Sequence, residues 1–137
     1  MMYGLNGYHE PQILAQLREK RFDLLRFGNH MGDPDHGVLA SILAAGFQAL
    51  VVVRDGRQVR EWGPALAGCH SEYWNEPDGA VDGYIDPAAY AAGVPDFVAA
   101  CAEVGATPWI GAISNLHRKA LSWFAAMMDA VHTSGYV

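Results

Sequence analysis

The chain has few charged residues, and few of these are basic. Lysine and arginine number 9 against 15 aspartates and glutamates, which gives a formal net charge of −6, and only 18% of the 137 residues are charged. Clustered Lys and Arg supply most of the affinity for nucleic acid, and the one basic cluster, Arg18, Lys20 and Arg21, is typical of a solvated helix face. The sequence therefore predicts no nucleic-acid partner. Its 51% hydrophobic residues are too many for a disordered chain and indicate a single globular domain.

Cysteines are scarce and long apolar runs are missing. Cys69 and Cys101 are the two cysteines, and no CxxC motif or Cys/His series surrounds them, so we expect buried thiols; a disulfide between them stays open. No segment is long and apolar enough to span a bilayer, and the first residues have neither the basic start nor the apolar stretch of a secretory signal. We therefore expect a soluble protein with no membrane partner and no signal peptide in the chain as given, in a compartment that stays unknown.

Loop motifs for nucleotides and for serine nucleophiles are also missing. No GxGxxG or Gly-Lys-Ser/Thr sequence is present, and there is no Gly-x-Ser-x-Gly elbow. His30, Asp33, Asp35 and His36 crowd one loop and look like metal ligands. However, Asp33 is explained as a helix cap, Pro34 disfavours a tight cage, and no matching His/Cys cluster follows. We therefore predict no metal and no cofactor.

Short apolar runs alternate with segments of helical period along the chain. We predict strands at residues 3–8, 22–27, 49–53, 69–77 and 107–112, with helices that begin near Pro11, Asp33-Pro34, Asp86-Pro87 and Leu116. The helix from Asp86 is expected to be interrupted at residues 93–95, because Pro95 breaks the helical hydrogen bonding. The valines at 51–53 lie in an unbroken apolar run, which is typical of a strand covered on both faces. The alternation predicts an α/β fold with a parallel sheet.

The most informative segment runs from residue 70 to residue 78. Side chains alternate along a strand, so an extended segment here places His70, Glu72, Trp74 and Glu76 on one face. Pro77 ends this strand because it cannot donate to the ladder, and it biases the preceding residue toward an extended conformation. We therefore expect Glu76 at the carboxyl end of a buried parallel strand, which is the edge of α/β sheets where ligands bind.

The sequence Trp74-Asn75-Glu76-Pro77 resembles the fourth-strand signature of the large clan of retaining glycoside hydrolases built on (β/α)8 barrels. In that clan the Glu of Asn-Glu-Pro is the general acid/base, and the preceding Asn hydrogen-bonds the sugar 2-hydroxyl. The resemblance implies that Glu76 is catalytic and that Asn75 binds substrate. The motif closes the fourth predicted strand, and Glu72 precedes it as a Glu does in many relatives.

Arg26 provides a second correspondence, because Leu24-Leu25-Arg26-Phe27-Gly28 resembles the clan's second strand, which ends with an Arg near the catalytic carboxylates. A fixed guanidinium would hold a neighbouring carboxylate ionised and oriented, and a structural ion pair is the alternative. The following loop places His30 on the expected active-site rim, so His30 is a further candidate for substrate contact. Trp62 and Trp109 are candidates for stacking on sugar rings, with core packing as the alternative.

The chain departs from the clan in length. A complete barrel takes about 250 residues, and the chain has 137. The resemblance therefore implies an α/β fold that is a partial (β/α)8 TIM barrel, with the first five βα units and without strands six to eight. The clan's nucleophile, a Glu on strand seven, would be absent, and Glu72 would lie roughly 13 Å along the strand from Glu76, too far for a carboxyl pair about 5–5.5 Å apart. We expect residues 1–137 to be an incomplete catalytic barrel of a retaining glycosidase, a fragment that acts on carbohydrate and is inactive or incomplete alone.

Two other functions stay open. One is a non-catalytic carbohydrate-binding or self-assembling half-barrel, since five βα units leave two unpaired edge strands through which copies can associate. The other is a flavodoxin-like doubly wound domain, whose size suits 137 residues better and which needs no missing strands. Two features count against the doubly wound domain: no phosphate loop follows the first strand, and the Asn-Glu-Pro motif would have no role.

Overall fold

Parallel strands alternate with helices in the computed structural model, which describes residues 3–4, 11–28, 34–79, 84–111 and 117–133. In chain order the elements are β1 (Tyr3–Gly4), α1 (Pro11–Glu19), β2 (Leu24–Gly28), α2 (His36–Ala44), β3 (Gln48–Val53), α3 (Gly56–Trp62), the short 3-10 helix η1 (Gly63–Leu66), β4 (His70–Tyr73), α4 (Pro87–Val104), β5 (Thr107–Ile110) and α5 (Arg118–Thr133). Residues 5–8 of the first predicted strand, residue 112 of the last, and the predicted helix starts at Asp33 and Leu116 lie outside the described residues.

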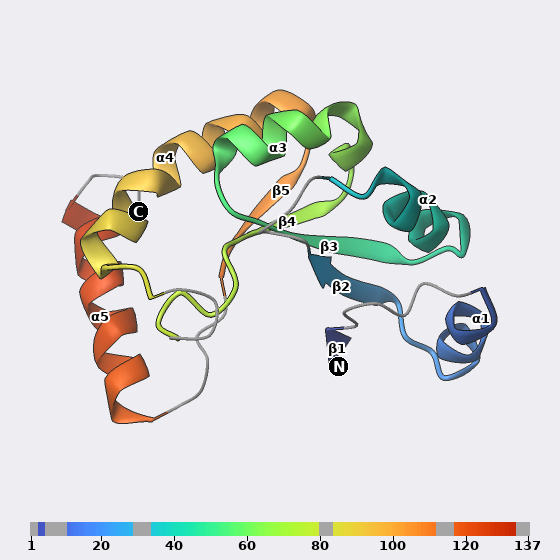
Figure 1. Ribbon diagram of the computed structural model, residues 1–137, viewed down its shortest axis with the longest axis horizontal. Coiled ribbons are helices and arrows are strands. Elements are labelled where there is room, and N and C mark those ends of the chain that lie inside the picture. Colours follow the sequence, from blue (N-terminus) through green and yellow to red (C-terminus); the bar gives the residue numbers. More distant parts are fainter. Residues whose placement is uncertain (1–2, 5–10, 29–33, 80–83, 112–116, 134–137) are drawn as a thin grey trace.

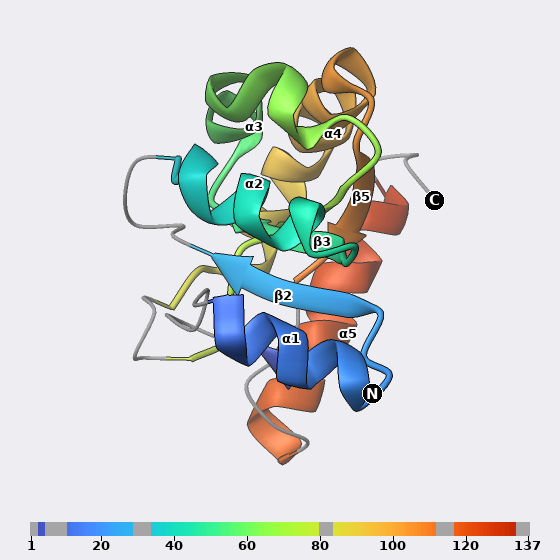
Figure 2. The same cartoon turned by 90° about the vertical axis from the view of Figure 1, so that its right-hand side faces the viewer.

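The sheet has the strand order β1-β2-β3-β4-β5, and each neighbouring pair is parallel. The helices follow one another in an arc along one side of this sheet (Figure 1), and the side view shows α1 and α2 covering β2 and β3 (Figure 2). A doubly wound sheet instead reverses its strand order at a switch point. The flavodoxin-like alternative is therefore wrong, and the described residues form five βα units of a partial barrel.

The two faces of the sheet have different roles. Leu25, Phe27, Val51, Val53 and Tyr73 belong to the main hydrophobic core, which packs between the strands and the helices. Because side chains alternate along a strand, the residues between them point to the opposite, inner face. The sequence of β2 places an arginine on this inner face, and the sequence of β4 places a glutamate there. The inner face therefore combines charged and apolar side chains.

Helix α4 runs from Pro87 to Val104 without a break, so the interruption predicted at residues 93–95 is wrong. A helix-interior proline costs about 3 kcal/mol, and the buried side chains of Tyr90, Val94 and Phe97 supply packing that offsets this cost. Gly93 lies against β4, where an added Cβ atom would collide with the hydroxyl of Tyr73. The Gly-Val-Pro sequence therefore allows a close helix–sheet contact instead of ending the helix.

Helix α4 begins at Pro87, as predicted. Helix α2 begins at His36, later than the start predicted near Asp33-Pro34. Asp86 caps α4 by accepting hydrogen bonds from the amides of Ala88 (2.9 Å) and Ala89 (3.3 Å). In α2 the capping residue is Asp35, which accepts from the Val38 amide at 3.0 Å. The predicted cap, Asp33, lies outside the described residues.

Strand β4 ends at Tyr73 rather than at Pro77. Trp74 and Glu76 have φ angles of 66° and 43°, in the left-handed region, so the chain turns here and the predicted extended conformation of Glu76 is wrong. The turn closes with a hydrogen bond of 2.8 Å from the Gly79 amide to the Glu76 carbonyl. Pro77 is the second residue of this turn, a position where proline is favoured. A turn therefore forms where the strand was predicted to continue.

Both cysteines are free and buried, as expected. Burial raises the pKa of Cys69, and it raises the pKa of Cys101 to about 11 against a smaller, opposing effect of Ser71. In the parts of the chain that the structure describes, no helix combines the length and the apolar character needed to cross a bilayer.

Candidate active site

A pocket of about 360 Å³ opens at the inner face of the sheet, near the carboxyl ends of the strands. Its walls are formed by Arg26, Leu50, Glu72, Asn75, Glu76, Trp109 and Ile110. These residues come from β2, β3, β4, the turn after β4, and β5. The pocket therefore brings together three residues that the sequence singled out, Arg26, Asn75 and Glu76, while His30 lies outside the described residues.

Arg26 and Glu72 form the central ion pair of this pocket. The arginine Nε lies 2.5 Å from Glu72 Oε2, and its Nη2 donates to Oε1 at 3.0 Å. The side chain of Glu72 is only 4% exposed and that of Arg26 is 21% exposed. A carboxylate buried to this extent needs a paired charge, and the two-point contact also fixes the orientation of both planar groups. Arg26 therefore holds a neighbouring carboxylate, and that carboxylate is Glu72.

The same guanidinium also positions Asn75. Arg26 Nη2 donates a hydrogen bond of 2.6 Å to Asn75 Oδ1. This contact connects β2 with the turn after β4, which lie on either side of β3 in the sheet. The side chain of Asn75 is thereby held at the edge of the pocket, next to Glu76.

Glu76 is half-buried and stands on a well-supported turn. The following Pro77 is fully buried, and its carbonyl accepts a hydrogen bond of 2.9 Å from the Ile85 amide. Because β4 stops at Tyr73, the spacing of an extended strand does not describe the separation of Glu72 and Glu76. Both carboxyl groups line the same pocket.

The two tryptophan candidates have different positions. Trp109 on β5 is half-buried, lines the pocket, and makes an edge contact with the ring of His70 at a centroid distance of 5.2 Å. Trp62 on α3 is buried and packs against Phe27 and His36, with centroid distances of 6.1 and 5.0 Å. Core packing is therefore the role of Trp62, and Trp109 supplies the aromatic wall of the pocket.

In the loop with the metal-like cluster, the structure describes Asp35 and His36, and both make other contacts. Asp35 caps α2, and His36 packs on Trp62. Among the described residues, no group of three or more His, Cys, Asp and Glu side chains is arranged to hold a metal ion.

Tyr90 on α4 contacts the strand ends beside the pocket. The predictions from sequence did not include this residue. Its buried hydroxyl donates to the Tyr73 carbonyl at 2.8 Å and accepts from the Gly111 amide at 2.9 Å. Burial raises the pKa of Tyr90 well above its usual range, so the hydroxyl keeps the proton that it donates. Tyr90 therefore joins the carboxyl ends of β4 and β5 to α4. A tyrosine in an apolar helix stripe gives no signal in the sequence that its hydroxyl meets two strand ends.

Comparison with known proteins gives a structural match. No protein-family model matches the chain, and a search of curated proteins finds no match. Among solved structures, a GH128 (subgroup II) endo-β-1,3-glucanase from Sorangium cellulosum has a similar fold, with a TM-score of 0.65 and 17% sequence identity over 96% of this chain and 54% of the glucanase. At this identity the likeness shows the fold alone, which is an α/β partial barrel of the type found in a glycoside hydrolase. The chain spans about half the length of that enzyme.

Replacing Arg26 with methionine is expected to lower the free energy of unfolding by about 3–5 kcal/mol, because it leaves the buried carboxylate of Glu72 unpaired. The double variant R26M/E72M removes both charges and is expected to recover most of this loss. Urea unfolding of the two variants and of E72M measures the coupling. If the unfolding free energy lost in R26M/E72M equals the sum of the losses in R26M and E72M, the ion pair does not stabilise the inner face.

Replacing Tyr90 with phenylalanine is expected to cost about 1–3 kcal/mol of unfolding free energy, because it leaves the buried Tyr73 carbonyl and Gly111 amide without their partner. Tyr84→Phe is the matched control, since Tyr84 is exposed and its substitution should change stability by less than about 0.5 kcal/mol. Equal urea midpoints for both variants would contradict the role of the Tyr90 hydroxyl.

Proposed function

We propose that residues 1–137 carry the acid/base half of the active site of a retaining glycoside hydrolase that cleaves β-1,3-glucan. The observation that carries this proposal is the meeting of Arg26, Glu72, Asn75 and Glu76 in one pocket at the carboxyl ends of parallel strands. The similar fold of an endo-β-1,3-glucanase supports the substrate class. The carboxyl ends of parallel barrel strands are also where such enzymes place their catalytic groups.

Glu76 is the proposed general acid/base. In the first step its neutral carboxylic acid gives a proton to the glycosidic oxygen while the bond from that oxygen to the anomeric carbon breaks and a second carboxylate attacks this carbon. In the second step the Glu76 carboxylate takes a proton from water, and the water oxygen displaces the second carboxylate. Glu76 ends the cycle protonated, as it began.

Asn75 and Arg26 are the proposed substrate-positioning residues. The hydrogen bond from Arg26 to Asn75 Oδ1 turns the amide of Asn75 into a fixed orientation beside Glu76. An amide held in this way is suited to bind a sugar hydroxyl, as the resemblance to the fourth-strand motif implies. Trp109 adds an aromatic face to the same pocket, which suits the apolar C–H surface of a sugar ring.

The second carboxylate is not Glu72 in this proposal. Both oxygens of Glu72 contact the guanidinium of Arg26, so an attack on carbon would require this pair to break. We propose instead that the nucleophile comes from strands that complete the barrel, which makes residues 1–137 an incomplete catalytic domain. In support, β1 and β5 are the two edges of the described sheet, and such edges favour the addition of further strands or association between copies.

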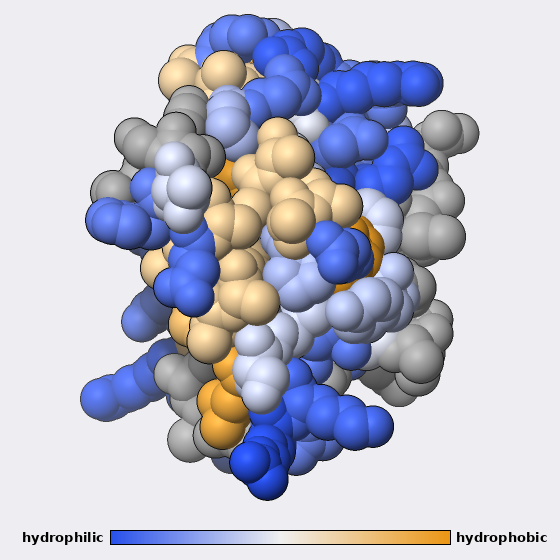
Figure 3. Space-filling view, turned by 90° about the vertical axis from the view of Figure 1, so that its left-hand side faces the viewer, coloured by the Kyte–Doolittle hydropathy of each residue, from blue (hydrophilic) through white to orange (hydrophobic). Residues whose placement is uncertain are grey.

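The surface of α5 gives further support for a missing neighbour. Leu121 and Phe124 on α5 are exposed large hydrophobic residues. The face of the molecule on which α5 lies carries apolar surface bordered by hydrophilic residues (Figure 3). In a complete barrel each helix packs against the helices on both sides, and the next helix would cover this surface.

Azide tests the role of Glu76 in the chain as it exists, because this small anion can attack the anomeric carbon in place of the second carboxylate. With azide and laminaritriose, whose sugar leaving group needs a proton, we expect a glycosyl azide product, and Glu76→Gln should lower its rate by about 10²–10⁴-fold. With a 2,4-dinitrophenyl β-glucoside, whose leaving group needs no proton, the same variant should lose much less. Mass spectrometry of the azide product measures both rates.

Glu61→Gln is the control for this experiment. Glu61 is an exposed carboxylate on α3, where it pairs with Arg57 at 2.8 Å, away from the pocket. This variant should react like the parent chain with both substrates. The same loss in Glu76→Gln with both substrates, or no glycosyl azide with either, would contradict the acid/base role.

One observation favours a second candidate, a non-catalytic carbohydrate-binding half-barrel. Among the residues that line the pocket there are two carboxyl groups, and one of them is held by Arg26 at both oxygens. With one carboxyl group held by Arg26, the pocket on its own is suited to bind sugar without cleaving it. Saturable binding of laminari-oligosaccharides together with a complete absence of azide chemistry is the result that would select this function.

A further inference from the structure

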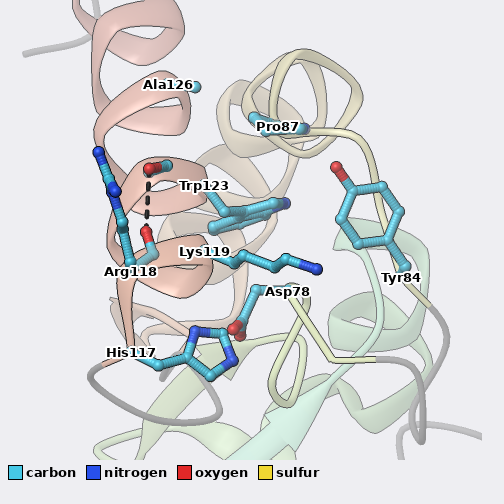
Figure 4. A pocket seen from close by; sticks show the side chains of 9 residues that line it. Asp78, Tyr84, Pro87, His117, Arg118, Lys119, Trp123 and Ala126 are labelled. Atoms are coloured by element: carbon cyan, nitrogen blue, oxygen red, sulfur yellow. Dashed lines mark hydrogen bonds between the residues drawn. The ribbon is translucent and has the colours of Figure 1, made fainter.

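A second hollow, of about 680 Å³, borders the turn that carries Glu76, because Asp78 of this turn lines it. It is lined by Asp78, Tyr84, Pro87, His117, Arg118, Lys119, Ser122, Trp123 and Ala126. The close-up shows Tyr84 facing α5 across the hollow, with Lys119 reaching toward the space between Tyr84 and Asp78 (Figure 4). The wall thus combines an aromatic ring with a carboxylate, an ammonium and an imidazole.

Fixed groups form two sides of this hollow. His117 Nδ1 accepts a hydrogen bond of 3.1 Å from the Ala120 amide, which caps the first turn of α5 and holds the imidazole ring. Trp123 is buried, and its indole N–H donates to the Ile85 carbonyl at 2.7 Å, which connects α5 with the segment before α4. Tyr84, in contrast, is 61% exposed. The hollow therefore has a prearranged wall and one large aromatic ring open to a ligand.

The mixed charge of the lining selects the ligand class. An anion would meet the carboxylate of Asp78, and a cation would meet the ammonium of Lys119. A neutral polyhydroxylated ligand instead uses both kinds of group, because its hydroxyls donate to the carboxylate and accept from the ammonium. The exposed ring of Tyr84 suits the apolar face of a sugar, as binding sites combine aromatic surface with a few polar groups.

The turn after β4 joins this hollow to the first pocket. Glu76 lines the first pocket and Asp78 lines the second. These residues belong to the same turn, which the Gly79–Glu76 hydrogen bond closes. We infer that the hollow between Tyr84 and α5 is a second saccharide subsite, which binds the continuation of a glucan chain that passes Glu76. This inference rests on the proposed function and adds the residues that recognise the longer substrate.

Two tryptophan indoles report on the two pockets separately, since Trp109 lines the first and Trp123 lines the second. In ¹H–¹⁵N NMR titrations, laminarihexaose should shift both indole signals, and laminaribiose should shift that of Trp109 at low concentration. Tyr84→Ala should weaken laminarihexaose binding about 10-fold, remove the shift of Trp123, and leave laminaribiose binding within about 2-fold. Tyr84→Phe keeps the ring and should keep most of the affinity.

The outcomes separate this inference from the proposed function. Laminarihexaose binding that shifts only Trp109 and is unchanged in Tyr84→Ala would overturn the second subsite and leave the first pocket standing. A shift of Trp123 alone, lost in Tyr84→Ala, would support the saccharide subsite and contradict the first pocket. No shift of either signal would overturn both, and a shift of Trp123 by inorganic phosphate but not by laminarihexaose would overturn the neutral-sugar assignment.

Discussion

The buried ion pair between Arg26 and Glu72 is the constraint on which the inner face depends. A carboxylate that is 4% exposed costs several kcal/mol of desolvation unless an opposite charge contacts it. The guanidinium meets this requirement from β2, two strands away, and with its remaining donor capacity it holds Asn75. One electrostatic requirement therefore sets the positions of three polar side chains in a pocket whose wall also includes Leu50, Trp109 and Ile110.

The turn after β4 places Glu76 in the wall of the pocket that contains this ion pair. Trp74 and Glu76 adopt left-handed backbone conformations, which cost about 1–3 kcal/mol each for residues other than glycine. Surrounding contacts hold them there: the hydroxyl of Tyr90 binds the Tyr73 carbonyl, and Pro77 is fully buried. Strained residues of this kind cluster at functional sites, and here they turn Glu76 toward one pocket and Asp78 toward another.

Close packing around the same turn leaves no room for larger residues. A Cβ atom on Gly111 would collide with the carbonyl oxygens of Tyr73 and Trp74, so β5 approaches the end of β4 at a glycine. The amide of this glycine then reaches the Tyr90 hydroxyl. The ends of β4, β5 and α4 thus form one connected unit, and the rim of the first pocket is built on it.

Much of the fold was predictable from local patterns, because apolar periodicity and cap residues report directly on helices and strands. The order of elements, the parallel sheet and the start of α4 at Pro87 follow from such patterns. Two local rules failed where tertiary contacts outweighed them. Pro95 lies inside a continuous helix, and Pro77 stands in a turn rather than at the end of a strand. Buried neighbours on α4 offset the cost of Pro95, and at Pro77 the proline itself is buried within a turn. Burial depends on contacts distant in sequence.

By itself the sequence determined the α/β class, the sequence of βα units, and the candidates Arg26, Asn75 and Glu76, since each of these depends on residues close together in the chain. Only the tertiary structure decided that Arg26 pairs with Glu72, that Tyr90 joins two strand ends, and that Asp78 and Tyr84 share a hollow with α5. These contacts join residues far apart in sequence. Their formation depends on the register of the parallel strands and the packing of the helices, which local patterns of hydrophobicity and charge do not specify.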